Sequence, residues 1–169
     1  WGRFPAALRD RPQWCVAGPD KRPLTSAGHA ASVTDPATWT DFETASRAAA
    51  AIGSLPGFVL TADDPFTGID LDVKDETTSE QLERFESIVA TFDSYTERSR
   101  SGRGWHIWVE GEIGKGRKRD GVEVYSQERF MICTGNLVRD RPITARQDLL
   151  DNLVSQMPAP PSALVLELA

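Results

Sequence analysis

The segment Gly68-Ile-Asp-Leu-Asp-Val73 constrains the fold of this chain most, because it sets two carboxylates two residues apart in an apolar run. In a β-strand successive side chains alternate between faces, so Asp70 and Asp72 share one face and their apolar neighbours share the other. Two adjacent anions repel each other unless a cation lies between them, and Mg²⁺ and Mn²⁺ prefer oxygen ligands. The segment therefore predicts a strand with a metal-binding face.

Length and composition favour a single domain. A chain of 169 residues with 40% hydrophobic content can bury one sizeable core. The sequence has no run of about 18 apolar residues and no charged-then-apolar leader, so we expect a cytoplasmic protein with no membrane partner. Pro158-Ala-Pro-Pro161 ends any helix, and residues 158–169 are expected to be a linker or tail within a longer protein.

The cysteines and histidines are too few for a zinc site. Cys15 and Cys133 both lie in apolar runs, which indicates reduced thiols in the core rather than a disulfide. With His29 and His106 as the only histidines, we expect no zinc.

Charge is unevenly distributed along the chain. The net charge is −6, yet the stretch from Arg98 to Arg146 carries eleven Lys and Arg against six Asp and Glu. Such asymmetry allows an acidic protein to present a basic face to a phosphate backbone. For the basic run from Lys115 to Arg119, a solvated turn of a hairpin is the alternative.

Periodicity and turn residues predict the elements. Strands are expected at residues 13–16, 57–60, 68–73, 105–109, 122–125 and 129–135. The strands at 57–60 and 68–73 are joined by a turn-rich segment, so we expect them to form a hairpin. Capping boxes beginning at Thr40, Thr78 and Thr144 predict three helices.

Three of the strands alternate in the same way. The polar-facing pairs are Asp70 and Asp72, His106 and Trp108, and Glu123 and Tyr125. If the opposite apolar faces share a core covered by helices, the polar faces lie together on the other side of one sheet. That arrangement predicts a cleft that contains three carboxylates and a histidine.

Three carboxylates suit a phosphoryl-transfer site with two metal ions about 3.5–4 Å apart. Asp70, Asp72 and Glu123 are the candidate catalytic residues and metal ligands. A nucleoside triphosphate also needs cationic and N–H donors, and the glycine-rich segment before His106 can supply them as an anion nest. The candidate nucleotide-binding residues are Ser101, Gly102, Arg103, Gly104 and His106.

Each signal has a structural alternative. An Asp-x-Asp pair also occurs on solvated strand edges, a glycine-rich turn is commonly a hairpin, and a single histidine on a strand is commonly structural. Trp14 and Trp39 are interpreted as core residues. Trp108 is left open between packing in the core and stacking on a base.

Taken together, these segments resemble the primase–polymerase domains of the archaeo-eukaryotic primase superfamily, as found at the N-terminus of phage and plasmid replication proteins. The resemblance rests on the segments 68–73, 99–106 and 121–125, followed by 129–136, and on 22–24 with 34–39 near the start. It implies an α+β fold in which an RRM-like catalytic sheet with packed helices, residues 57–157, lies beside a small N-terminal α/β lobe, residues 1–56. Residues 1–157 would form one domain.

The function expected is template-directed nucleotidyl transfer, namely a DNA polymerase with primase activity in mobile-element replication. The resemblance implies two Mg²⁺ or Mn²⁺ ions, dNTP or NTP substrates, single-stranded or primer–template DNA, and a helicase as a fused or separate partner. A phage-encoded protein would act in the host cytoplasm. The residues expected to bind nucleic-acid phosphates are Arg98, Lys115, Arg117, Lys118, Arg119 and Arg129.

Two other functions remain open from the sequence. A metal-dependent nuclease also uses three carboxylates and two ions, but hydrolysis needs no nest for a triphosphate. A non-catalytic single-strand-binding module is the other alternative, and clustered acids on its sheet face would repel phosphate in the absence of metal.

Overall fold

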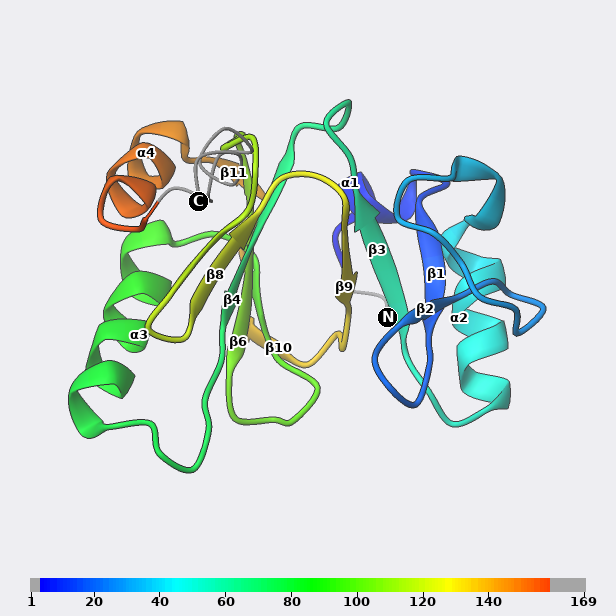
Figure 1. The fold of residues 1–169 in the computed structure, drawn as a ribbon, viewed down its shortest axis with the longest axis horizontal. Coiled ribbons are helices and arrows are strands. Elements are labelled where there is room, and N and C mark those ends of the chain that lie inside the picture. Colours follow the sequence, from blue (N-terminus) through cyan, green and yellow to red (C-terminus); the bar gives the residue numbers. More distant parts are fainter. Residues whose placement is uncertain (1–3, 159–169) are drawn as a thin grey trace, which may run out of the picture.

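The structure is a computed structural model that describes residues 4–158, and it contains two largely antiparallel sheets with helices packed on them (Figure 1). The helices in this part of the chain are α1 (Ala6–Arg9), α2 (Phe42–Ala51), α3 (Ser79–Phe92) and α4 (Gln147–Ser155), with one 3₁₀ turn, η1 (Pro36–Thr38). The strands are β1 (Trp14–Ala17), β2 (Pro23–Leu24), β3 (Pro56–Leu60), β4 (Phe66–Leu71), β5 (Thr96–Arg98), β6 (Trp105–Glu110), β7 (Arg117–Arg119), β8 (Val122–Tyr125), β9 (Arg129–Ile132), β10 (Leu137–Arg139) and β11 (Thr144–Ala145).

The larger sheet brings together the three strands that share the alternating pattern. Its order is β10-β5-β6-β4-β8-β7, and β11 adds to β6 in parallel. The central strand β4 is antiparallel to β6 on one side and to β8 on the other. The predicted adjacency of these three strands is therefore confirmed. β4 ends at Leu71, so Asp72 lies just beyond it and still donates its backbone N–H to the Gly121 carbonyl at 2.9 Å.

The smaller sheet has the order β2-β1-β3-β9, so the predicted hairpin between 57–60 and 68–73 is wrong. β3 pairs with β1 and β9, whereas β4 belongs to the larger sheet. The expected boundary at residue 56 falls at the first residue of β3 and does not coincide with the division between the sheets. Of the expected tail, residues 159–169 lie outside the described residues.

Two hydrophobic clusters hold these layers together. One lies between the larger sheet and helices α3 and α4, and it contains Ile69, Leu71, Ile107 and Val124. The other joins the smaller sheet to the opposite face of the larger one, and it includes Trp14 and Trp108. The ring of Trp108 packs edge-on against Phe58 with centroids 5.8 Å apart. Trp108 is therefore a core residue and does not stack on a base. Trp39 is half-buried, and its ring N–H donates to the Ser32 carbonyl.

One of the three predicted capping boxes is confirmed. At the start of α3, Thr78 and Gln81 cap each other's backbone N–H groups. At α2 the cap is Asp41 instead of Thr40, because the Asp41 carboxylate accepts from the Thr44 backbone N–H. Thr144 lies in β11 and does not cap α4, since its hydroxyl donates to the Pro142 carbonyl.

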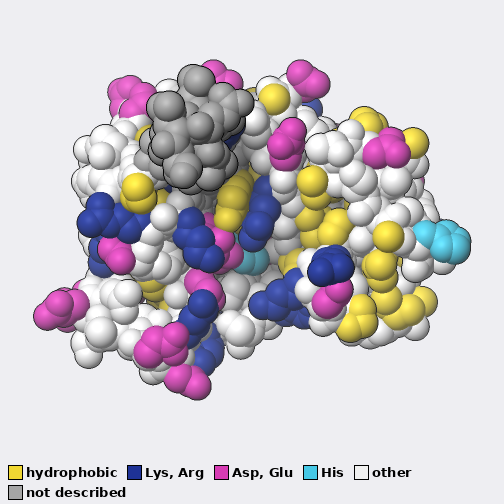
Figure 2. All heavy atoms as spheres, viewed as in Figure 1, with side chains coloured by type: hydrophobic (Ala, Val, Ile, Leu, Met, Phe, Trp, Pro, Cys, Tyr) yellow, Lys and Arg dark blue, Asp and Glu magenta, His cyan; other side chains and the backbone are white. Residues whose placement is uncertain are grey.

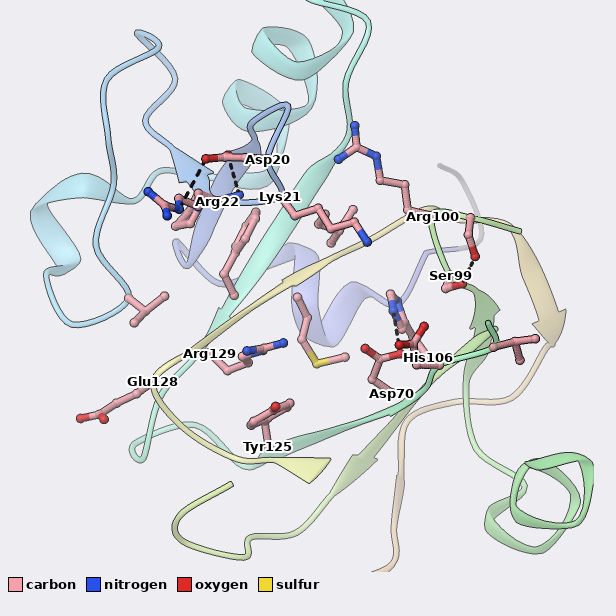
Figure 3. Close-up of a pocket in the computed structure, with 18 residues that line it drawn as sticks. Asp20, Lys21, Arg22, Asp70, Ser99, Arg100, His106, Tyr125, Glu128 and Arg129 are labelled. Atoms are coloured by element: carbon pink, nitrogen blue, oxygen red, sulfur yellow. Dashed lines mark hydrogen bonds and ion pairs between the residues drawn. The ribbon is translucent and has the colours of Figure 1, made fainter. Parts of the chain in front are cut away.

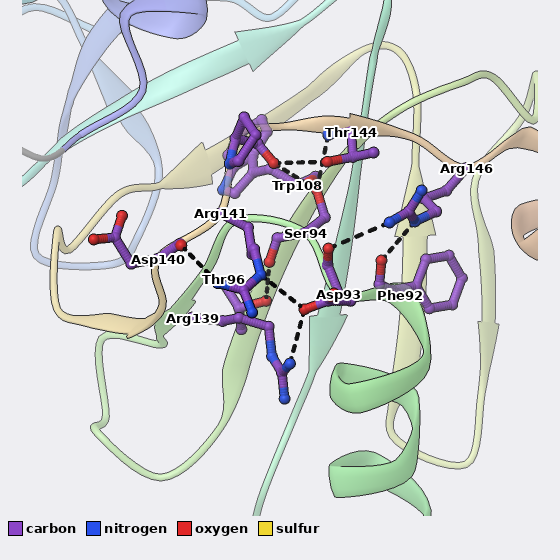
Figure 4. A network of polar contacts seen from close by, with 11 residues as sticks. Phe92, Asp93, Ser94, Thr96, Trp108, Arg139, Asp140, Arg141, Thr144 and Arg146 are labelled. Atoms are coloured by element: carbon purple, nitrogen blue, oxygen red, sulfur yellow. Dashed lines mark hydrogen bonds and ion pairs between the residues drawn. The ribbon is translucent and has the colours of Figure 1, made fainter.

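The C-terminus of α3 is closed by arginines from later in the chain (Figure 4). Asp93 adopts a left-handed backbone conformation there, and its carboxylate pairs with Arg139 at 2.8 Å and Arg141 at 3.3 Å. The Arg139 hydrogen bond lowers the pKa of Asp93. Arg146 donates to the Phe92 carbonyl at 2.7 Å, a helix-end group that would otherwise lack a partner. These contacts attach α3 to the segment that leads into α4.

Cys15 and Cys133 are buried and unbridged, as predicted for core thiols. Within residues 4–158, no helix is both long enough and apolar enough to cross a membrane.

Candidate active site

One polar row crosses five strands of the larger sheet. In the strand register, Glu97 of β5 is opposite His106 of β6, His106 is opposite Asp70 of β4, Asp70 is opposite Glu123 of β8, and Glu123 is opposite Lys118 of β7. Directly opposed residues point to the same face of a sheet, so these side chains are neighbours. The structure thus brings Asp70, His106 and Glu123 together, as the alternation predicts.

Asp70 lies in the middle of this row. Burial raises its pKa, the His106 charge opposes that shift, and the nearby Glu123 and Asp72 carboxylates add to it. His106 Nε2 is 3.6 Å from the nearer Asp70 oxygen. Burial alone would lower the pKa of His106, but contact with Glu97, the charge of Asp70 and the Ile132 carbonyl together raise it. The row therefore favours an imidazolium between two carboxylates.

The other two predicted carboxylates differ in their surroundings. Asp72 is more exposed and lies 3.5 Å from the Lys74 amine. Glu123 is buried, and it accepts a 2.6 Å hydrogen bond from the Tyr125 hydroxyl. Burial, followed by this hydrogen bond, raises the pKa of Tyr125 to about 12, so the phenol stays protonated at neutral pH. The Arg129 guanidinium stacks over the Tyr125 ring at 4.2 Å.

A pocket of about 540 Å³ opens between the two sheets at this row. From the larger sheet and its loops it is lined by Asp70, Asp72, Ser99, Arg100, Ser101 and His106 (Figure 3). Arg129 and its neighbours in β9 form the floor, and the β1–β2 loop forms the opposite wall. In Figure 2, Lys and Arg side chains gather along the hollow between the two halves, with acidic side chains among them. A space with carboxylates on one side and cations around it suits a nucleotide with bound metal.

The glycine-rich loop from Ser99 to Gly104 is folded by its own hydroxyl groups. The Ser99 hydroxyl accepts from the Gly104 N–H at 3.1 Å and lies 3.2 Å from the Ser101 hydroxyl. Gly102 has φ +78°, and a Cβ on Gly104 would collide with the Leu71 carbonyl at the end of β4. The glycines thus hold the loop against the strand that carries Asp70.

The structure places the predicted nucleotide-binding residues in two groups. Ser101 and His106 line the pocket, whereas Gly102, Arg103 and Gly104 do not. Arg103 points instead to Asp75, with 2.9 Å between its guanidinium and the carboxylate. The sequence could not predict that Arg103 points away from the pocket, because local patterns do not indicate where the loop that carries Asp75 lies.

Sequence reasoning missed three cations at the pocket. Lys21 and Arg22 come from the β1–β2 loop, and Arg100 comes from the glycine-rich loop. Lys21 has φ +68°, a conformation uncommon for a residue with a side chain, and that side chain points into the pocket. The Arg100 guanidinium reaches across to the Gly18 carbonyl at 3.4 Å. The Gly-Pro punctuation of residues 18–23 signalled a loop, but nothing local indicated what the loop faces.

Comparison with known proteins agrees with this geometry. Residues 1–162 match the family described as "Bifunctional DNA primase/polymerase, N-terminal". The chain belongs to this family. It is also 38% identical over 131 residues to a DNA primase-polymerase of Nitratiruptor phage NrS-1. That alignment covers 72% of the chain but 18% of the phage protein, so the chain spans less than a fifth of this relative.

The primase/polymerase family generally uses divalent metal ions, and carboxylates are suitable ligands for them. Among residues 4–158, no three His, Cys, Asp or Glu side chains converge into a ready-made metal site. Asp70 and Asp72 nevertheless line the same pocket, and the charges of Glu123 and Asp72 add to the effect of burial in raising the pKa of Asp70. A divalent cation would relieve that repulsion. The residues therefore fit a cation at Asp70 and Asp72, with Glu123 on the adjacent strand.

The residues predicted to bind nucleic-acid phosphates in this family member are dispersed. Arg117, Lys118 and Arg119 form β7, an edge strand, and Lys115 is exposed just before it. Several of the six already have contacts: Arg98 stacks on Trp105 at 4.6 Å, Arg119 donates to the Gln156 carbonyl at 2.6 Å, and Arg129 lines the pocket.

Proposed function

We propose that this chain is a template-directed nucleotidyltransferase, a DNA polymerase with primase activity, that adds nucleotides to a 3′-hydroxyl with two Mg²⁺ or Mn²⁺ ions. The observation that carries the proposal is that Asp70, Asp72, Ser101, His106 and a set of cations line one and the same pocket. Carboxylates suit the metals, and the cations and hydroxyls suit the triphosphate. Family membership supports the same activity.

The roles follow from position in the pocket or beside it. Asp70, Asp72 and Glu123 would hold the ions, which when bound activate the attacking 3′-hydroxyl and offset charge on the phosphates. Ser101, His106, Lys21 and Arg100 would contact the triphosphate of the incoming dNTP or NTP, with Gly102, Arg103 and Gly104 shaping the loop. Positioning of the two reactants supplies much of the acceleration in such reactions.

Template and primer would lie along the hollow between the sheets. We assign phosphate contacts to Arg129 at the pocket and to the cations of β7 with Lys115, and a smaller one to Arg98. Such contacts are electrostatic, so template binding would weaken as salt increases. The larger sheet with α3 and α4 would be the RRM-like catalytic unit of an archaeo-eukaryotic primase fold, with residues 1–157 acting as one domain.

The setting of the chain is also part of the proposal. The phage relative carries the name of a DNA primase-polymerase and is much longer than this chain. We propose that this domain acts in mobile-element DNA replication, in the host cytoplasm if phage-encoded, and that a helicase accompanies it as a fused or separate part. Residues 158–169 would link the two.

The test is incubation of the chain with an unprimed single-stranded template, labelled dNTP or NTP, and Mg²⁺ or Mn²⁺, with the products sized. Metal-dependent products longer than a dinucleotide on unprimed template establish primase activity, and extension only of a supplied primer establishes polymerase activity alone. Degradation of the template without incorporation would replace the proposal with a nuclease, and metal-independent binding without incorporation would replace it with a binding module.

A further inference from the structure

Glu97 is a fully buried carboxylate with no part in the proposed site. It lies in the middle of β5 and has no solvent exposure. Its two oxygens accept hydrogen bonds from the Thr134 N–H at 2.8 Å, the Gly135 N–H at 3.0 Å and the Tyr95 hydroxyl at 3.1 Å. A buried carboxylate without donors strongly opposes folding, and three donors here make an ionised group tolerable.

The remaining neighbour of Glu97 is His106. The Oε1 atom of Glu97 lies 3.6 Å from Nδ1 of the imidazole, and the register places the two residues directly opposite each other. Nδ1 is buried and has no hydrogen-bond partner among the described residues, whereas Nε2 faces Asp70 at 3.6 Å. The carboxylate is thus the anion nearest to the one ring nitrogen that faces away from Asp70.

The orientation of an imidazole is set by what its second nitrogen contacts. A carboxylate at Nδ1 keeps a proton on that atom and disfavours the flipped ring, in which a C–H group would face the carboxylate. Nε2 is then the atom that faces Asp70 and the pocket. We infer that Glu97 is a positioning residue for His106, fixing the ring so that Nε2 is presented to the reacting phosphates.

The same carboxylate connects the two halves of the molecule. Thr134 and Gly135 lie between β9, in the smaller sheet, and β10, in the larger one. Glu97 therefore attaches this crossing segment to the ring of His106. The catalytic consequence rests on the proposed function, but the orientation of the ring does not.

A purely structural role is the competing explanation, in which Glu97 only closes the turn at residues 134–135. Both roles predict that Glu97→Gln lowers stability, because a side-chain N–H would then face backbone N–H donors. They differ at His106. A structural role leaves the ring's proton distribution unchanged, whereas a positioning role changes it.

The first experiment reads the ring directly. The chain contains two histidines, and His29 is exposed, so long-range ¹H–¹⁵N spectra of ¹⁵N-histidine-labelled protein contain one reporter and one internal control. We expect a proton on Nδ1 of His106 in the wild type, a changed pattern for His106 in Glu97→Gln, and no change for His29. A wild-type ring with Nδ1 unprotonated would overturn the inference without any variant, as would an unchanged pattern in Glu97→Gln.

Tyr95→Phe is the matched control. It removes one donor to Glu97 and leaves the carboxylate, so it tests the loss of a buried hydrogen bond alone. We expect it to keep the wild-type pattern at His106. A pattern like that of Glu97→Gln would show that disturbance of β5, and not loss of the carboxylate, moves the ring, which would overturn the inference.

The second experiment measures primer extension. Loss of a residue that orients a functional ligand typically reduces activity about 10- to 100-fold, and we expect this for Glu97→Gln. Because the effect would pass through His106, Glu97→Gln should cause no more than about a twofold further loss in a His106→Ala background. Independent, multiplying losses would overturn the inference. A wild-type chain without extension would count against the proposed function, whereas the spectra would still test the position of the ring.

Discussion

The two walls of the pocket are built in different ways. On the larger sheet, the side chains of His106 and Asp70 are 8% and 25% exposed, and each has charged neighbours on adjacent strands. On the opposite wall, the Arg22 side chain is 84% exposed, and Lys21 has no ion-pair partner in the part of the chain that the structure describes. Buried, opposed groups on strands are held precisely, whereas exposed cations on a loop supply charge. The difference suggests chemistry on one wall and ligand capture on the other.

The largest effect should come from the central carboxylate. In Asp70→Asn, the lost contribution to metal binding and transition-state charge is worth several kcal/mol, or about a thousandfold in the rate of primer extension. The measurement is single-nucleotide incorporation on a primed template with Mn²⁺. Asp63→Asn removes an exposed carboxylate on the β3–β4 connection and should retain wild-type activity. Full activity in Asp70→Asn would exclude this row as the catalytic site.

The opposite wall should give a smaller effect of another kind. Lys21→Asn removes the positive charge, and asparagine tolerates the left-handed conformation at this position. If Lys21 captures the triphosphate, the KM for dNTP should rise about fivefold while kcat changes little. Arg47→Gln is the control, because it removes an exposed cation from α2, outside the pocket. A fall in kcat with unchanged KM in Lys21→Asn would show that this wall takes part in the chemical step and does not only capture the ligand.

The wall on the larger sheet could be predicted because its information is local. Alternation in β4, β6 and β8 fixes which side chains share a face, and pairing of adjacent strands then brings Asp70, His106 and Glu123 together. Asp72 keeps its place on this face although β4 ends at Leu71, two residues before the predicted end, since its backbone N–H still donates to the Gly121 carbonyl.

The assignment of strands to sheets could not be predicted in this way. Gly57 and Gly68 read as the first residues of two strands joined by a turn, but both pack closely against β9. A Cβ on Gly57 would collide with the Phe130 ring, and one on Gly68 would collide with the Met131 sulfur. Such contacts join residues more than sixty positions apart, so local strand propensity cannot predict them.

Glu97 was missed for a related reason. In sequence, Thr96-Glu97-Arg98 is a short polar segment. Three of the four contacts of Glu97, with His106, Thr134 and Gly135, join it to residues at a distance along the chain. Two of its three hydrogen-bond donors are backbone N–H groups, which no residue pattern reveals. The same holds for Lys21, whose role depends on where the β1–β2 loop is placed by the rest of the smaller sheet.

The smallest expected effect concerns stability: Asp70→Asn, which should lose activity, should gain stability in the absence of metal. Burial and like charge raise the pKa of Asp70 despite the attraction of His106, so folding favours the protonated form. Stability from a raised pKa is present below the unfolded value and is lost as pH rises through the folded pKa, so at neutral pH the ionised carboxylate opposes folding. Asp70→Asn should therefore melt higher than the wild type in metal-free buffer, by about 2–4 °C if the difference is about 1 kcal/mol. The difference in melting temperature between Asp70→Asn and the wild type should shrink as pH falls toward the pKa of Asp70 in the folded protein.

Added Mn²⁺ sharpens the same comparison. A ligand that binds only the folded state raises its melting temperature, so Mn²⁺ should stabilise the wild type and Asp63→Asn more than Asp70→Asn. The difference in melting temperature between the wild type and Asp70→Asn should then narrow or reverse as the Mn²⁺ concentration increases. Thermal melts at fixed pH, with and without Mn²⁺, measure both effects in one series. A variant that melts lower than the wild type in metal-free buffer would show that the contact with His106 outweighs the repulsion, and the carboxylates would then need no cation to be explained.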